Sequence, residues 1–128
     1  MKKGLLVLFI TISGLCFSCK KDKEESAPVE IYGKWKLTET MNDPGDGSGK
    51  YIKATGEPKY LSFDKDGKLA GDALYMDVFR YRILDSTRIE ILYQNYVSPQ
   101  VYWYKLTSKT LQINPPCIEG CGLRFVRN

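Results

Sequence analysis

The sequence predicts an all-β domain, folded as a small antiparallel up-and-down barrel of about eight strands. From Glu30 onward apolar and polar residues alternate with period two, and no stretch of ten or more residues shows the 3.6-residue repeat of an amphipathic helix. Short turn sequences separate the runs, so successive strands are expected to pair as antiparallel neighbours. The chain has 128 residues, which is room for one domain of ordinary size.

The expected strands follow one another with short links such as Asp64-Lys-Asp-Gly67, Asp85-Ser-Thr87 and Thr107-Ser-Lys109. Closing them into a barrel pairs every strand edge, whereas the alternative, a two-sheet sandwich, usually needs a long crossing connection. The longest polar connection, residues 42–49, is expected at an open and mobile rim. In chain order the strands are predicted near residues 31–40, 51–54, 59–63, 68–70, 76–84, 88–93, 101–106, 110–113 and 122–127.

The N-terminal segment has the pattern of an export signal. Lys2 and Lys3 precede an apolar run, residues 4–15, that is shorter than the ~20 residues of a membrane-spanning helix, so residues 1–18 are predicted to be a signal peptide. Ser18 stands directly before Cys19, and a charged run follows. This segment resembles the signal of bacterial lipoproteins, with cleavage as an ordinary secreted protein as the alternative.

The lipoprotein resemblance implies a membrane anchor. In that family the cysteine becomes the first residue of the mature chain and carries a diacylglycerol and an amide-linked fatty acid such as palmitate. Cys19 fits better than Cys16, because a small residue precedes Cys19 whereas Leu15 precedes Cys16. Residues 19–29 would then be the lipidated cysteine and a flexible tether, and residues 30–128 the barrel. The expected location is the outer membrane, facing the periplasm or the cell surface.

A short motif at each end of the domain resembles the lipocalin family. Gly33-Lys34-Trp35 opens the first strand, and Arg127 lies in the last strand on the same face as Leu123 and Phe125. In lipocalin-like barrels this tryptophan crosses the closed end and the arginine packs on its ring, a cation–π contact of ~0.5 to 2 kcal/mol. Arg124 is expected to face water. The resemblance implies a small-molecule binder.

Cys117 and Cys121 are expected to form a disulfide. Two glycines, Gly120 and Gly122, permit the bend, and an exported protein meets an oxidising compartment. The chain contains no histidine, which removes most zinc sites and the usual catalytic triads. We therefore expect no enzyme activity, no metal and no cofactor. The net charge of +4 is small and scattered, which argues against a nucleic-acid partner.

Aromatic residues are the remaining functional signal. One face of the central strands is expected to carry a set of side chains that either fills the barrel or lines a small apolar pocket. Trp103 is expected on the opposite face, covered by a loop or exposed as a partner contact. Two hypotheses follow: a membrane-anchored binder of a small apolar or amphipathic ligand, or a filled barrel that acts as an envelope adaptor or inhibitor. The candidate pocket residues are Phe79, Tyr81, Tyr93, Tyr102 and Tyr104.

Overall fold

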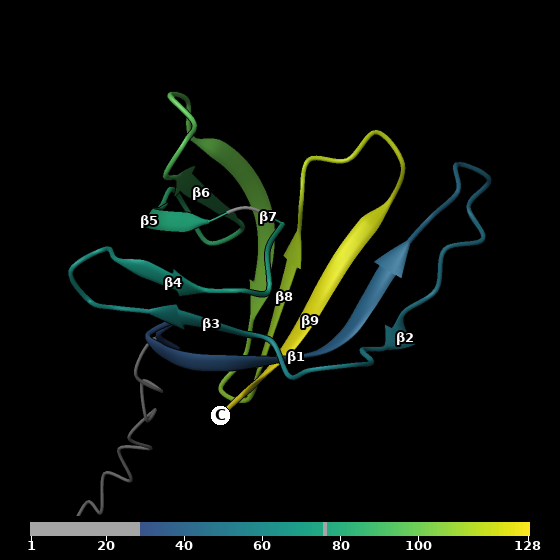
Figure 1. The fold of residues 1–128 in the computed structure, drawn as a ribbon, viewed down its shortest axis with the longest axis horizontal. Coiled ribbons are helices and arrows are strands. Elements are labelled where there is room, and N and C mark those ends of the chain that lie inside the picture. Colours follow the sequence, from purple (N-terminus) through teal and green to yellow (C-terminus); the bar gives the residue numbers. More distant parts are fainter. Residues whose placement is uncertain (1–28, 76) are drawn as a thin grey trace, which may run out of the picture.

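The computed structural model describes residues 29–75 and 77–128 (Figure 1). The predicted signal peptide, the candidate lipidation site Cys19 and the tether up to residue 28 lie outside this part. The described part is all-β, as predicted, and among its residues no helix is long and apolar enough to cross a membrane. The strands are β1 (Gly33–Asn42), β2 (Ile52–Lys53), β3 (Tyr60–Phe63), β4 (Leu69–Gly71), β5 (Val78–Ile83), β6 (Arg88–Tyr93), β7 (Gln100–Leu106), β8 (Thr110–Asn114) and β9 (Cys121–Arg127).

The strands form one antiparallel sheet that curls into a nearly closed barrel. The strand order is β4-β3-β1-β9-β8-β7-β6-β5, and β2 pairs with β1 beside this path. The first and last long strands are therefore neighbours, as up-and-down closure requires. Backbone contacts join the two ends of the sheet at a bridge between Lys68 and Arg80 and through the amide of Tyr81, which donates to the carbonyl of Gly67 at 3.0 Å.

The barrel has two different ends. One end, which we call the arm end, carries residues 29–32 and the connections β3–β4, β5–β6 and β7–β8. The opposite end, the loop end, carries the connections β1–β2, β4–β5, β6–β7 and β8–β9, whereas the β2–β3 connection runs beside the middle of β1. The chain therefore enters the barrel at the arm end, where β9 also ends (Figure 1).

The barrel interior is filled by side chains. Every second residue of β6 points inward, and Ile89 and Ile91 are 0% exposed. A side chain with no accessible surface has no water-sized space against it. The largest side chains of this kind are Trp35, Phe63, Phe125, Leu61, Ile89, Ile91, Leu111 and Ile113, so the centre of the barrel is packed.

Two of the predicted strands begin two residues too early. The first strand begins at Gly33 rather than at residue 31, because Gly33 has φ +114° and breaks the extended run. Ile31 and Tyr32 form part of an N-terminal arm instead. The fifth strand begins at Val78 rather than at residue 76, and residue 76 itself is outside the described part.

The prediction that Phe79 faces the interior is wrong. A β-bulge between Val78 and Arg80 inserts one residue into β5, and the register of side chains changes there. Val78 and Tyr81 are buried on the inner face, whereas Phe79 is 48% exposed. Period-two alternation cannot show such an insertion, because a bulge shifts the pattern by one residue.

Candidate functional site

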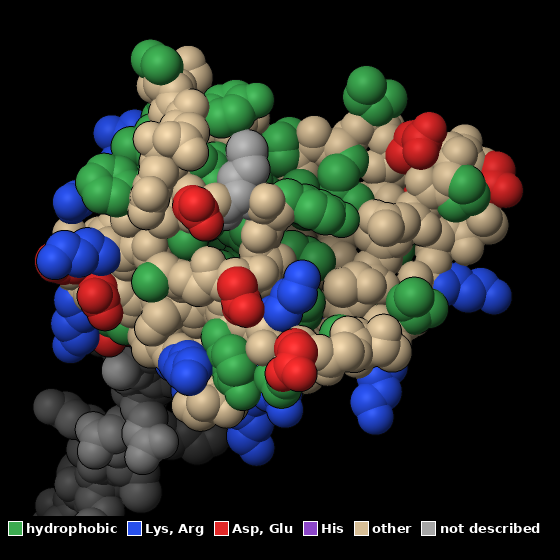
Figure 2. All heavy atoms as spheres, in the orientation of Figure 1, with side chains coloured by type: hydrophobic (Ala, Val, Ile, Leu, Met, Phe, Trp, Pro, Cys, Tyr) green, Lys and Arg blue, Asp and Glu red, His purple; other side chains and the backbone are tan. Residues whose placement is uncertain are grey.

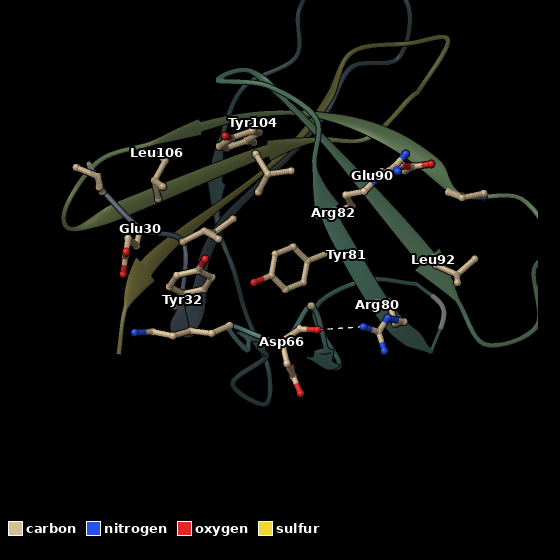
Figure 3. Close-up of a pocket in the computed structure, with 16 residues that line it drawn as sticks. Glu30, Tyr32, Asp66, Arg80, Tyr81, Arg82, Glu90, Leu92, Tyr104 and Leu106 are labelled. Carbon is tan, nitrogen blue, oxygen red and sulfur yellow. Dashed lines mark hydrogen bonds and ion pairs between the residues drawn. The ribbon is translucent and has the colours of Figure 1, made fainter. Parts of the chain in front are cut away.

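A broad hollow lies at the arm end of the barrel. Its inner and outer parts together measure about 840 Å³. The arm, the β3–β4 turn, the end of β5 and strand β7 all contribute to its walls. Figure 3 shows Tyr81 projecting into this space with its hydroxyl directed toward the side where Tyr32 lies. The resemblance implied that this end, which carries Trp35, would be the closed one, and the structure places the main hollow here.

The hollow has an inner and an outer part. Tyr81 pairs in register with Ile91, which is on the inner face of the sheet, whereas Arg82 pairs with Glu90 on the outer face. A single cavity cannot lie on both faces of a sheet. The hollow therefore consists of two separate spaces, one on each face. The inner part is lined by Ile31, Tyr32, Tyr81, Ile83, Tyr104 and Leu106, and we call it the aromatic mouth.

The aromatic mouth combines apolar walls with a few polar groups. The hydroxyl of Tyr81 donates to the carbonyl of Asp64, and the hydroxyl of Tyr104 donates to the carbonyl of Asp85 at 2.9 Å. Each hydroxyl oxygen keeps acceptor capacity for a ligand. Burial raises the pKa of Tyr81 to about 12, and burial followed by the charge of Asp85 raises the pKa of Tyr104, so both groups are neutral at physiological pH.

Basic side chains stand at the rim of the mouth. The Lys65 ammonium lies 5.6 Å from the centroid of the Tyr32 ring. Arg80 donates to the carbonyl of Asp66 at 3.0 Å (Figure 3). A polar head group at the rim would therefore meet donors, while an apolar body would meet aromatic and aliphatic walls.

A clasp made by two side chains fixes the arm beside the mouth. The Arg127 guanidinium lies over the Trp35 indole, with 4.2 Å between the guanidinium carbon and the ring centroid. Arg127 also donates to the carbonyls of Tyr32, Glu30 and Ser108 at 2.6, 2.8 and 3.1 Å. The Trp35 indole N–H donates to the carbonyl of Ile31 at 2.8 Å. Three consecutive arm carbonyls are thus satisfied by Trp35 and Arg127.

Gly33 is part of this clasp for a steric reason. A Cβ at this position would lie 3.2 Å from Nη1 of Arg127, and the backbone φ of +114° is one that other residues rarely adopt. The glycine therefore allows both the turn from the arm into β1 and the close approach of the guanidinium. This explains physically why glycine precedes tryptophan by two positions in the motif.

The remaining pocket candidates from the sequence do not join the mouth. Tyr93 and Tyr102 are buried in the core, and their hydroxyls hydrogen-bond to each other. Burial raises the pKa of both tyrosines. Phe79 points outward, so only Tyr81 and Tyr104 of the predicted set line the aromatic mouth.

The mouth also contains residues that the sequence analysis missed. Ile31 and Tyr32 were assigned to a strand, and Lys65 was assigned only to a turn. Their position depends on the clasp. It joins Arg127 to Glu30, which is 97 positions away along the chain. Only the expected contact between Trp35 and Arg127 pointed toward this end of the barrel.

Trp103 is exposed on the outer face of β7, with 57% of its surface accessible. Val101, on the same face of the strand, is 41% exposed. Of the two alternatives from the sequence, a loop cover or an exposed aromatic, the structure shows the second. The β1–β2 loop, which the sequence places at an open and mobile rim, lies at the loop end.

The β1–β2 loop is organised by one carboxylate. Asp43 accepts hydrogen bonds from the amides of Gly45, Gly47 and Gly49 at 2.8 to 3.1 Å, and these amides hold the pKa of Asp43 below its usual value. Its own amide donates to the carbonyl of Gly120 at 2.7 Å. The loop is therefore tied to the β8–β9 connection rather than free at the rim.

Cys117 and Cys121 form a disulfide within the β8–β9 connection, with 6.1 Å between their Cα atoms.

Arg124, expected to face water, is only partly exposed, because its side chain is 43% accessible. Its guanidinium stacks 3.6 Å from the centroid of the Tyr51 ring and pairs with the Glu39 carboxylate at 3.2 Å. Gly122 lies beneath the Tyr51 hydroxyl, where a Cβ would collide with it.

Among residues 29–75 and 77–128, no three metal-ligating side chains lie close enough together to hold an ion. No protein-family model, curated protein or solved structure matches the chain.

Proposed function

We propose that this protein is a membrane-tethered β-barrel that binds a small amphipathic molecule in the aromatic mouth. The observation that carries the proposal is the mouth itself, an open hollow at one end of an otherwise packed barrel. Its walls supply apolar and aromatic contact, and the hydroxyls of Tyr81 and Tyr104 supply a few oriented polar groups. The ligand would sit in the mouth rather than in the centre of the barrel, because the centre is filled.

The proposal includes the membrane anchor expected at Cys19. The resemblance of residues 1–19 to a lipoprotein signal supports this part. Two or more acyl chains hold a protein stably at a bilayer, since each buried CH₂ contributes ~0.8 kcal/mol. The location proposed is the outer membrane, on its periplasmic or outer face.

A titration tests the ligand site. Purified protein is mixed with single-chain amphipaths and hydrophobic dyes, and complexes are counted by native mass spectrometry. Ile83→Glu places a carboxylate in the mouth at a position already 42% exposed, and Ile52→Glu is the matched control at a 64% exposed position outside the mouth. We expect about a tenfold or larger loss of affinity for Ile83→Glu alone, which corresponds to ~1.4 kcal/mol.

A second candidate function is partner docking through the outer face of β7. The observation that favours it is the pair of exposed apolar side chains, Trp103 and Val101, on one face of the strand. Crosslinking through a photoreactive group at position 103 in cells tests this alternative. Recovery of a specific partner together with no ligand for the mouth would favour it over the first proposal.

A further inference from the structure

The arm and the aromatic mouth occupy the same end of the barrel. Residues 29–32 are themselves part of the wall of the hollow, and the clasp of Trp35 and Arg127 holds their carbonyls. Wherever the preceding residues lead, the chain leaves the barrel at the rim of the mouth. The attachment point of the proposed anchor is thus defined relative to the ligand site.

The distance from the anchor to the rim is short. Ten peptide steps separate Cys19 from Val29, so even a fully extended chain covers at most about 33 to 36 Å. Strand β7, with seven residues, is about 23 Å long at the usual rise per residue. The tether therefore keeps the arm end near the bilayer, and its reach alone does not decide which end of the barrel faces the lipid.

The two ends of the barrel differ in charge. The connections at the loop end carry five carboxylates and one lysine: Asp43, Asp46, Asp72, Asp77 and Glu119 against Lys50. An anionic lipid surface repels this end. The loop tips there also expose Tyr75, Val97 and Ile118, and Figure 2 shows hydrophobic side chains at the tips of the two loops that project upward in Figure 1. Any insertion of these tips would bring the carboxylates to the lipid head groups.

The arm end is close to neutral. The arm and the connections there carry Glu30, Asp64, Asp66 and Asp85 against Lys65, Lys68 and Lys109. Arg80, Arg82 and Arg88 lie beside them, with Glu90 as one further carboxylate. Three of the acids are ion-paired, Asp66 with Lys68, Glu90 with Arg82 and Asp85 with Arg88. An anionic bilayer therefore meets less repulsion at this end than at the loop end.

From the arm position and the charge distribution we infer that the rim of the aromatic mouth is a membrane-apposed surface. The tethered barrel turns its arm end toward an anionic bilayer, and the amphipathic ligand enters the mouth from the lipid side. This inference rests on the proposed function, because it requires the anchor at Cys19.

Two labelled variants test the orientation. Lys109→Cys lies on the β7–β8 turn at the arm end, outside the mouth, and Val97→Cys lies at a loop-end tip that is 99% exposed. With Cys117 and Cys121 bonded and Cys19 lipidated, the new cysteine is the free thiol for a fluorophore. The mature lipoprotein is reconstituted in phosphatidylcholine vesicles with and without phosphatidylglycerol, each containing a head-group quencher lipid.

We expect quenching at position 109 to exceed quenching at position 97 several-fold, and the difference to shrink in vesicles without phosphatidylglycerol or at high salt. Equal or stronger quenching at position 97 would overturn the inference and would indicate insertion of the loop-end tips. The proposed function is checked separately on the same samples. Vesicle flotation reports the anchor, and native mass spectrometry of the detergent-released protein reports ligand binding.

Discussion

Arg127 covers the indole of Trp35 at 4.2 Å and at the same time donates to the backbone of the arm. The last strand, the first strand and the entering chain are joined at this one place. A guanidinium suits the position because its planar fork can stack on a ring and bond several carbonyls together, which an ammonium group cannot do.

Removal of this clasp should destabilise the barrel. For Arg127→Ala we expect a loss of ~1 to 3 kcal/mol in the free energy of unfolding, because a cation–π contact disappears and arm carbonyls lose their donors. Urea unfolding followed by tryptophan fluorescence measures the change. Arg82→Ala is the control, since the Arg82 side chain is 73% exposed and its ion pair with Glu90 should contribute at most ~1 kcal/mol. Equal effects of the two substitutions would contradict the clasp.

The glycine beside the clasp provides an independent check. Gly33→Ala combines an unfavourable backbone conformation with a close contact to Arg127, so we expect a loss of ~1 to 3 kcal/mol. Gly47→Ala is the matched control, because its φ is also positive, at +78°, but no atom lies within 4 Å of the added Cβ. If the clasp matters, Gly33→Ala is the more destabilising of the two in urea. An equal or smaller effect of Gly33→Ala would contradict a steric role of Gly33 in the clasp.

Alkaline pH should weaken the fold through the buried tyrosines. The pKa of Tyr81 is raised from 10.0 to about 12, and the pKa values of Tyr93 and Tyr102 are raised as well. A group whose folded pKa is raised stabilises the fold fully below its unfolded pKa, and this contribution is lost as pH rises, between 10 and about 12 for Tyr81.

Tyrosinate absorbance and circular dichroism measured against pH test this prediction. We expect a late-titrating group of tyrosines whose ionisation coincides with loss of β-sheet signal. Guanidinium-unfolded protein is the reference, in which every tyrosine should titrate near the ordinary value of ~10. Ionisation of all tyrosines near that value in the folded protein would contradict the burial of Tyr81, Tyr93 and Tyr102.

The anchor makes its own prediction. Cys19→Ala should abolish membrane association, because it removes the only thiol that the signal pattern places after a small residue. Cell fractionation followed by a high-salt wash measures it, and Cys16→Ala is the control that should remain membrane-bound. Continued association of Cys19→Ala with membranes after the wash would mean that the chain is not a lipoprotein.

Much of the fold could be predicted because its signals are local. Alternation within β6 identifies Ile89, Ile91 and Tyr93 as inward residues, and the Asp64 to Gly67 turn is visible from its own residues. The face of Phe79 could not be predicted, because the bulge beside it depends on pairing with β6.

The position of the candidate site was predicted less well for a related reason. Tyr81 and Tyr104 were identified from alternation, yet Tyr93 and Tyr102, with the same spacing pattern, pair with each other in the core. Which tyrosine meets solvent depends on where the arm crosses the barrel end. That crossing is set by contacts between Arg127 and Glu30, which are distant in the sequence.

The most direct test of the account locates a bound ligand. A spin-labelled single-chain amphipath is titrated into ¹⁵N-labelled protein, residues 20–128, and line broadening of the amide signals is recorded. We predict broadening centred on Tyr32, Tyr81 and Tyr104 around the aromatic mouth. Broadening centred on Val101 and Trp103 would contradict the proposal that the mouth is the binding site. The absence of broadening at ligand concentrations up to the critical micelle concentration would contradict it as well.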